Sequence, residues 1–257
     1  MDDYEVRFGG VARLVGRLGA ERLRAAHVAV VGMGGVGTWA VEALARSGIG
    51  SLTLIDLDEI CITNVNRQLH ALDGQIGRSK VAAMGERVRS IWPGCELVLE
   101  ERFLSAANAR ELLGRGCDVV VDAIDSVDAK CCLVAHCREM GLRVVTCGGA
   151  GGKRDATKVR VADLTHATND RLLKRLRKKL RQDYGFPRTD RELGIPAVYS
   201  KENAVYPWSD GRVCSSVEPG NESRINCDTG LGTAAFVTGT FGLAAAGEVV
   251  RWLSETR

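Results

Sequence analysis

The stretch VAVVGMGGVG, from Val28 to Gly37, constrains the fold of this chain more than any other part of the sequence. The small and β-branched run 28–31 is typical of a strand buried on both faces of a parallel sheet. Glycines then end the strand with residues that can adopt positive φ and carry no Cβ. A helix is predicted over 38–47. Strand, glycine turn and helix N-terminus together predict an anion site, most often for a phosphate.

The glycine motif does not by itself choose between a dinucleotide and ATP, and a tight turn without a ligand is a further alternative. Its glycines are Gly32, Gly34, Gly35 and Gly37. Further apolar runs predict strands at 51–55, 97–99, 118–125 and 142–146, with helices at 81–91, 106–113 and 127–140 between them. This alternation predicts an α/β fold with a Rossmann-like, mostly parallel sheet and helices on both of its faces.

Length and composition set the broad class. A chain of 257 residues with 45% apolar and 26% charged residues is typical of a folded globular protein. Its net charge of +3 permits a nucleic-acid partner without requiring one. The polar start MDDYEVRFGG lacks the pattern of a secretory signal, so the nine cysteines are predicted to be reduced thiols of a cytoplasmic protein. No Cys-x-x-Cys pair occurs, and we therefore expect no zinc site of ribbon type.

Polar residues after the second predicted strand point to a triphosphate. Asp56 lies where a carboxylate at a strand end meets ribose hydroxyls, and Asp58 follows it. Arg67 lies on a loop and Lys80 at a helix start, and both can converge on the glycine turn. Two cations at a phosphate mouth suit ATP, whose charge grows during phosphoryl or nucleotidyl transfer. A dinucleotide needs fewer cations.

Asp125 and Ser126 follow another buried strand, at the edge of the sheet where open α/β folds bind ligands. A carboxylate beside substrate phosphates is a typical Mg²⁺ ligand, so Asp125 is the candidate metal residue. The alternative is that Asp125 caps the helix 127–140. Both roles are compatible.

The rest of the chain flanks a predicted nucleotide-binding core at 27–152. An N-terminal arm, 1–26, is expected to contain turns at 7–10 and 13–16 and a short helix at 20–26. The C-terminal half, 153–257, is expected to hold a strand at 159–163, a basic helix at 171–181, an irregular segment at 184–228 and an apolar helix at 231–250.

Two C-terminal elements each allow two interpretations. The basic helix carries seven Lys or Arg residues around one leucine face, typical of a surface helix or, alternatively, of a contact with a phosphate backbone. The apolar helix approaches the minimum length of a membrane span. Its glycines and threonines favour packing on the sheet or on a dimer partner instead, so we do not expect membrane association.

Several of these motifs together resemble the ubiquitin-activating (E1-like, ThiF/MoeB/HesA) superfamily. They are Gly32-x-Gly34-Gly35-x-Gly37, Asp56-x-Asp58, Asn64-x-x-Arg67-Gln68, Lys80 and Asp125. The resemblance implies a single ATP-binding domain, 1–257, homodimeric in most members, that adenylates a carboxylate. It implies that Asp56 holds the ribose and that Asp125 holds Mg²⁺. The same resemblance assigns the triphosphate to Asn64, Arg67 and Lys80.

A closer resemblance, over nearly the whole chain, is to the tRNA-modifying branch of that superfamily. The stretches that carry it include RFGGVARLVG, VVVDAIDSVDAK, CGGAGG, VYPWSDGRVC and NCDTGLGTA. This branch uses ATP to cyclise the threonylcarbamoyl group on adenosine 37 of tRNA with loss of water. The resemblance therefore implies tRNA as substrate. A monovalent cation is a further ligand that it leaves open.

Two features depart from the superfamily's pattern. In many members an arginine of the N-terminal arm crosses the dimer to the ATP, but Gly10 occupies that position here, so Arg13 or Arg7 would have to replace it. Some relatives have a cysteine that accepts sulfur, with a cysteine desulfurase or sulfur acceptor as partner. Cys227 is a better candidate for that thiol than Cys214.

Other functions compete with tRNA cyclisation. An activator of a small carrier protein that ends in Gly-Gly would release AMP in response to that carrier and not to tRNA. A nucleotide-binding scaffold would turn over no nucleotide with any acceptor, and a redox protein would bind NAD. The side chains of Asn64, Arg67 and Lys80 argue against NAD.

Overall fold

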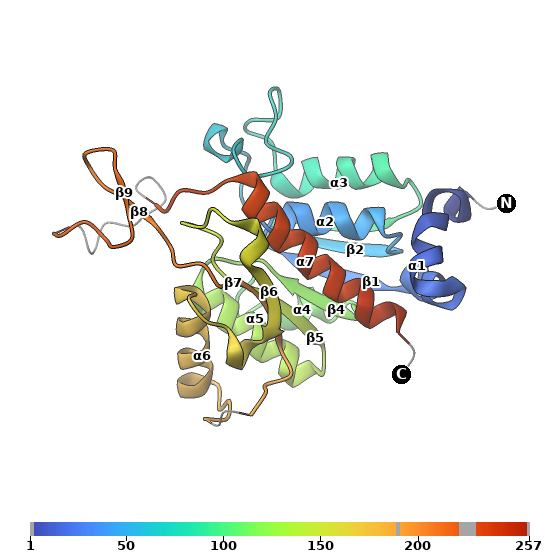
Figure 1. The fold of residues 1–257 in the computed structure, drawn as a ribbon. Helices are drawn as coiled ribbons and strands as arrows, with labels where there is room; N and C mark the ends of the chain where they lie inside the picture. Colours follow the sequence, from blue (N-terminus) through green and yellow to red (C-terminus); the bar gives the residue numbers. More distant parts are fainter. Residues whose placement is uncertain (1–2, 189–190, 221–229, 256–257) are drawn as a thin grey trace.

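The computed structural model describes residues 3–188, 191–220 and 230–255. Its main sheet has seven strands in the order β3-β2-β1-β4-β5-β7-β6 (Figure 1). Only β6 runs antiparallel, against β7, while the other pairings are parallel. The strands are β1 His27–Val31, β2 Ser51–Ile55, β3 Glu96–Glu100, β4 Val119–Asp122, β5 Arg143–Cys147, β6 Val159–Asp163 and β7 Pro196–Ser200. The predicted Rossmann-like, mostly parallel sheet is confirmed.

Helices cover both faces of the sheet, as predicted (Figure 1). Alternate residues of a strand point to opposite faces. In β1, Val28 and Val30 belong to one buried cluster, whereas Ala29 and Val31 belong to the other. The first cluster packs on α1 Asp3–Ala25, α2 Gly37–Arg46, α3 Lys80–Ile91 and α7 Ala235–Ser254. The second packs on α4 Ala109–Leu113, α5 Val127–Met140 and α6 Arg171–Asp183.

The C-terminal helix α7 lies against α2, and its small residues make this approach possible. A Cβ on Gly242 would lie 2.4 Å from the carbonyl oxygen of Val36, and a Cβ on Gly239 would lie 3.4 Å from the ring of Trp39. The helix therefore braces the turn that begins α2. Among the described residues, no helix combines the length and the apolar character needed to cross a lipid bilayer.

Two predictions about the flanking segments are wrong. The turn expected at 7–10 is absent because helix α1 runs through it, whereas the turn expected at 13–16 corresponds to a kink at Gly16, where φ is +77°. Tyr4 and Phe8 hold this helix in place by packing on Trp92. The segment 184–228 was expected to be irregular, but residues 196–200 form β7, between β5 and β6 of the sheet.

The remaining elements are short. A two-stranded hairpin consists of β8 Tyr206–Pro207 and β9 Val213–Cys214 and stands away from the main body (Figure 1). Single 3₁₀ turns occur at η1 Ile62–Asn64, η2 Ala156–Lys158 and η3 Leu164–His166. The first of these turns, η1, ends at Asn64, one of the residues predicted to bind the triphosphate.

Candidate nucleotide site at the C-terminal edge of the sheet

The glycine turn between β1 and α2 forms an open cradle of amide groups. Gly32 has a φ of +95°. A Cβ on Gly37 would lie 1.8 Å from the carbonyl oxygen of Gly32, so only glycine fits there. Within the described part of the chain, the amides of residues 34–37 donate to no acceptor. Free amides at the N-terminus of a helix bind anions, and this cradle fits a phosphate.

The two outer positions of the turn should respond differently to an added methyl group. Gly37→Ala should lower the free energy of unfolding by about 1–3 kcal/mol, because the new Cβ overlaps a backbone oxygen. Gly34→Ala is its matched control, since a Cβ there has no neighbour within 4 Å. Denaturant unfolding without nucleotide measures both. Equal stabilities of the two variants would contradict the observed turn.

Asp56 ties the end of β2 to the glycine turn. One carboxylate oxygen accepts the amide of Met33 at 2.6 Å and the other accepts the amide of Asp58 at 2.8 Å. Burial raises the pKa of this carboxyl, while the positive charge of Lys80 opposes the shift. Asp56 therefore supports the turn, and each of its oxygens keeps a lone pair for a further donor.

The two predicted cations lie near the glycine turn and the end of β2. Lys80 is buried at the start of α3, and its Nζ donates to Asp58 Oδ2 at 2.7 Å. Arg67 lies over the glycine turn, since a Cβ on Gly35 would be 3.1 Å from Arg67 Cγ. Its NH1 group donates to the carbonyl of Thr63 at 2.9 Å. The fold thus brings both cations to the predicted edge.

Asn64 and Gln68 are buried beneath the loop that carries Arg67. Asn64 Oδ1 accepts the amide of Cys61 at 3.0 Å and so closes η1. Gln68 Oε1 has no hydrogen-bond partner in the described structure. A buried amide oxygen without a donor is costly and indicates a partner that the protein alone does not supply.

Asp125 extends from the turn after β4, where it is exposed and makes no hydrogen bond or ion pair within the described residues. The alternative that it caps α5 is wrong, because Ser126 is the N-cap residue and uses no side-chain hydrogen bond. The described residues contain no cluster of three or more potential metal ligands. Proteins usually bind Mg²⁺ through one or two carboxylates, with substrate phosphates and water as the other ligands. The free carboxylate of Asp125 suits that role.

A buried ion pair under this turn was missed by the sequence analysis. Lys130 and Asp122 are both fully buried, with Lys130 Nζ 2.8 Å from Asp122 Oδ2. Thr146 donates its hydroxyl to the same oxygen at 2.6 Å, and the amide of Ile124 donates to Oδ1. The pair thereby shapes the turn that presents Asp125. A carboxylate within the apolar run VVVDAI was the available signal, because a buried carboxylate requires a partner.

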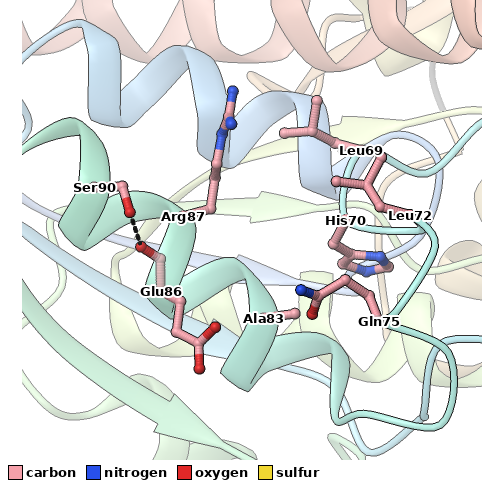
Figure 2. Close-up of a pocket in the computed structure, with 8 residues that line it drawn as sticks. All are labelled: Leu69, His70, Leu72, Gln75, Ala83, Glu86, Arg87 and Ser90. Carbon is pink, nitrogen blue, oxygen red and sulfur yellow. Dashed lines mark hydrogen bonds between the residues drawn. The ribbon is translucent and has the colours of Figure 1, made fainter.

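A pocket of about 200 Å³ lies behind the site, between α3 and the loop that follows Gln68 (Figure 2). His70 lines it, and its Nε2 is 3.2 Å from the carbonyl oxygen of Met33 in the glycine turn. Its Nδ1 has no partner among the described residues. Burial lowers the pKa of His70 to about 4. His70 is therefore neutral near pH 7 and packs directly beneath the phosphate cradle.

Acid should destabilise the fold through His70. The imidazole is neutral in the folded protein until about pH 4, whereas the unfolded chain takes up a proton near pH 6.5. The contribution of the neutral imidazole to the unfolding free energy is thus complete above pH 6.5. It is lost as the pH falls toward 4, a change of about 3 kcal/mol. Unfolding free energies of the wild type and His70→Gln across this range test the effect. Parallel pH profiles would contradict it.

Two predicted residues are not brought to the site, and a third lies outside the described residues. Arg13 is exposed on α1, which packs at the C-terminal end of α2, where Tyr4 donates to the carbonyl of Gly48 at 2.8 Å. The glycine turn lies at the other end of α2. Cys214 is half-buried in the β8–β9 hairpin, and Cys227 lies outside the described residues.

Comparison with known proteins agrees with this arrangement. The model of the ThiF family matches residues 10–257. A tRNA threonylcarbamoyladenosine dehydratase of Haemophilus influenzae is 46% identical over 252 residues, covering 97% of this chain and 94% of that protein.

Solved structures show the same fold. The tRNA N6-threonylcarbamoyladenosine dehydratase of E. coli, solved in complex with ATP, superposes with a TM-score of 0.86 at 40% identity and covers 98% of this chain and 96% of its own. Its complex with AMP gives a TM-score of 0.87 at 40% identity, with the same coverage. The chain therefore belongs to the ThiF family and, within it, to the family of the tRNA threonylcarbamoyladenosine dehydratases.

Proposed function

We propose that this protein uses ATP to adenylate the carboxylate of threonylcarbamoyladenosine at position 37 of tRNA and then cyclises that group with loss of water. The observation that carries the proposal is the cradle of free amides at residues 34–37, placed beside Asp56 and Lys80. Relatives of matching length that are solved with ATP and with AMP support it.

Each polar group at this edge has a role in the proposal. The free amides and Lys80 hold the phosphates of ATP, and Arg67 covers them from the other side of the turn. Asp56 accepts the ribose hydroxyls through its remaining lone pairs. Asp125 would hold Mg²⁺, which supplies charge neutralisation on the phosphates when bound. Asn64 and Gln68 support the Arg67 loop from below.

The chemistry follows from this placement. An oxygen of the threonyl carboxylate attacks the α-phosphorus of ATP in line, and pyrophosphate leaves. Lys80 and Arg67 stabilise the charge that develops on the phosphate oxygens. The ureido group of the same substrate then attacks the acyl carbon, loses a proton and expels AMP as the ring closes. The scheme needs no protein nucleophile, so Cys214, Cys227 and a sulfur-transfer partner have no part in it.

We also propose that the protein acts as a homodimer. Arg13 lies at the far end of α2 from its own glycine turn, so it can reach ATP only in a neighbouring subunit. Leu14 and Leu18, beside it on α1, are 86% and 65% exposed. Apolar side chains at such positions are typical of a subunit interface. Because tRNA is the substrate, we place the enzyme in the cytoplasm.

AMP formation by the purified protein tests the function. With ATP and tRNA that carries threonylcarbamoyladenosine, AMP should appear, and the modified nucleoside should lose one water by mass spectrometry. The control is the same tRNA without the threonylcarbamoyl group. If AMP release depended instead on a Gly-Gly-ended carrier protein, the protein would be a carrier activator and the proposal of tRNA cyclisation would be wrong.

A further inference from the structure

Helix α6 lies beside α5 (Figure 1). It packs there through a leucine face, and its outer face is rich in cations. Leu173, Leu176 and Leu180 are fully buried, and they hold the helix against the body of the protein. The helix carries seven cations over residues 171–181. Packing explains the leucines, but it does not explain this charge.

Three of the seven cations have structural partners. Lys179 forms ion pairs with Asp128 and Asp183. Arg177 donates to the carbonyls of Leu164 and Ala167 at 2.9 Å, and Arg181 also makes an interaction within the protein. These cations fasten α6 to its surroundings, so they are not available to a ligand.

The other four cations are exposed and form no ion pair in the described structure, and one of them, Arg171, contacts the ring of Tyr206. They form what we call the cation stripe: Arg171, Lys174, Arg175 and Lys178. Their spacing of three, four and seven residues places them on one face of the helix, over a length of about 10 Å. A row of cations of this length can face consecutive phosphates of a nucleic-acid strand, each of which carries one negative charge.

The stripe begins at the edge of the nucleotide site. Asp170, the N-cap of α6, accepts the amide of Gly149 at 2.9 Å, and Gly148 is packed too closely against Asp170 to carry a Cβ. These glycines directly follow β5, the neighbour of β4, whose C-terminal turn carries Asp125. A ligand whose reacting group lies at that edge therefore has α6 beside it.

The β8–β9 hairpin extends the same surface. The guanidinium group of Arg171 lies 5.1 Å from the centre of the Tyr206 ring, and that of Arg212 lies 5.1 Å from the Trp208 ring. Tyr206 is buried and joins the hairpin to α6, whereas Trp208 is only half-buried. An accessible aromatic ring beside an arginine, as at Trp208, is typical of surfaces that contact single-stranded RNA, where bases stack and phosphates pair. The loop of a tRNA offers both groups.

We propose that the cation stripe of α6 docks the phosphate backbone of the tRNA substrate, beside the modified nucleotide. The proposal rests on the proposed function for the identity of the RNA. What it adds is the place where the RNA binds. The RNA lies on α6 and the hairpin, and not on the α1 and α3 side of the molecule.

A pair of charge-matched double variants tests the proposal. Lys174→Gln with Lys178→Gln removes two cations of the stripe, and Arg17→Gln with Arg89→Gln removes two exposed cations of α1 and α3. The Kd for modified tRNA is measured for both and for the wild type over a range of salt concentrations, with thermal unfolding as the folding control.

The stripe variant should raise Kd about tenfold or more at low salt and reduce the salt dependence, as a log–log slope, by about 1.5. It should raise the KM for tRNA in parallel, while the control variant keeps wild-type values. Equal effects of the two variants, or none, would overturn the proposal. Wild-type protein that binds tRNA through the stripe but does not dehydrate it would support the docking surface and reject the proposed function.

Discussion

Replacing Lys80 by Met is expected to lower kcat/KM for ATP by about 10²–10³, equivalent to roughly 3–4 kcal/mol of transition-state stabilisation. Lys80 is 6% exposed, and its charge acts on Asp56 at the phosphate cradle. A cation in such a dry position has a large effect on the charge that grows as the α-phosphorus is attacked. AMP formation at saturating modified tRNA measures the loss.

A neighbouring cation provides the matched control. Arg78 lies two residues before Lys80, but its guanidinium group forms an ion pair with Glu86 on the exposed side of α3. Arg78→Met should leave kcat/KM within about twofold of the wild type. The melting temperature of Lys80→Met should stay near that of the wild type, because its partner Asp58 is 52% exposed and remains hydrated. Similar losses in both variants would show that Lys80 has no specific role.

Replacing Lys130 by Met should cost about 3–5 kcal/mol of unfolding free energy. The change leaves the carboxylate of Asp122 fully buried without its cation, with only the Thr146 hydroxyl and the Ile124 amide as donors. Guanidinium unfolding measures the loss. Because the same carboxylate shapes the turn before Asp125, the folded fraction should also bind ATP with Mg²⁺ more weakly.

A double-mutant cycle separates the ion pair from simple packing. Asp122→Val together with Lys130→Met replaces the charged pair by apolar residues, and most of the lost stability should return. The two single changes should therefore cost more in sum than the double variant. Additive costs would contradict the assignment of Lys130 and Asp122 as a mutually dependent buried pair.

Local patterns predicted most of the core. The apolar run 28–31 and the glycines after it specify β1 and its turn, because a short β-branched run favours a buried strand and the glycines end it. The alternating segment 159–163 and the helix 127–140 were predicted at their observed boundaries. These segments carry their own apolar periodicity, so local sequence was sufficient.

The errors share a physical cause, since they depend on contacts between distant parts of the chain. The run PAVYS resembles a loop next to its prolines and glycines, yet it forms β7 because β5 and β6 supply partners on both sides. Gly9 and Gly10 suggest a turn, but α1 continues through them because Tyr4 and Phe8 pack on Trp92. Neither contact is visible in the local pattern.

The polar residues of the candidate site were predicted from the sequence, whereas the buried residues beneath them were not. Asp56, Arg67 and Lys80 all lie at the expected edge of the sheet. Lys130 and His70 were overlooked, since a single Lys or His in a helix or loop resembles an ordinary surface residue. Only the fold shows that Lys130 meets Asp122, or that His70 lies under Met33.

The fate of one oxygen atom tests the central claim most directly. Modified tRNA that carries a heavy oxygen isotope in the threonyl carboxylate would be incubated with the protein and ATP, and the nucleotide products analysed by mass spectrometry. Attack on the α-phosphorus predicts that the label moves into AMP as the ring closes. Label in inorganic phosphate together with ADP, or AMP without label, would contradict adenylation at this site.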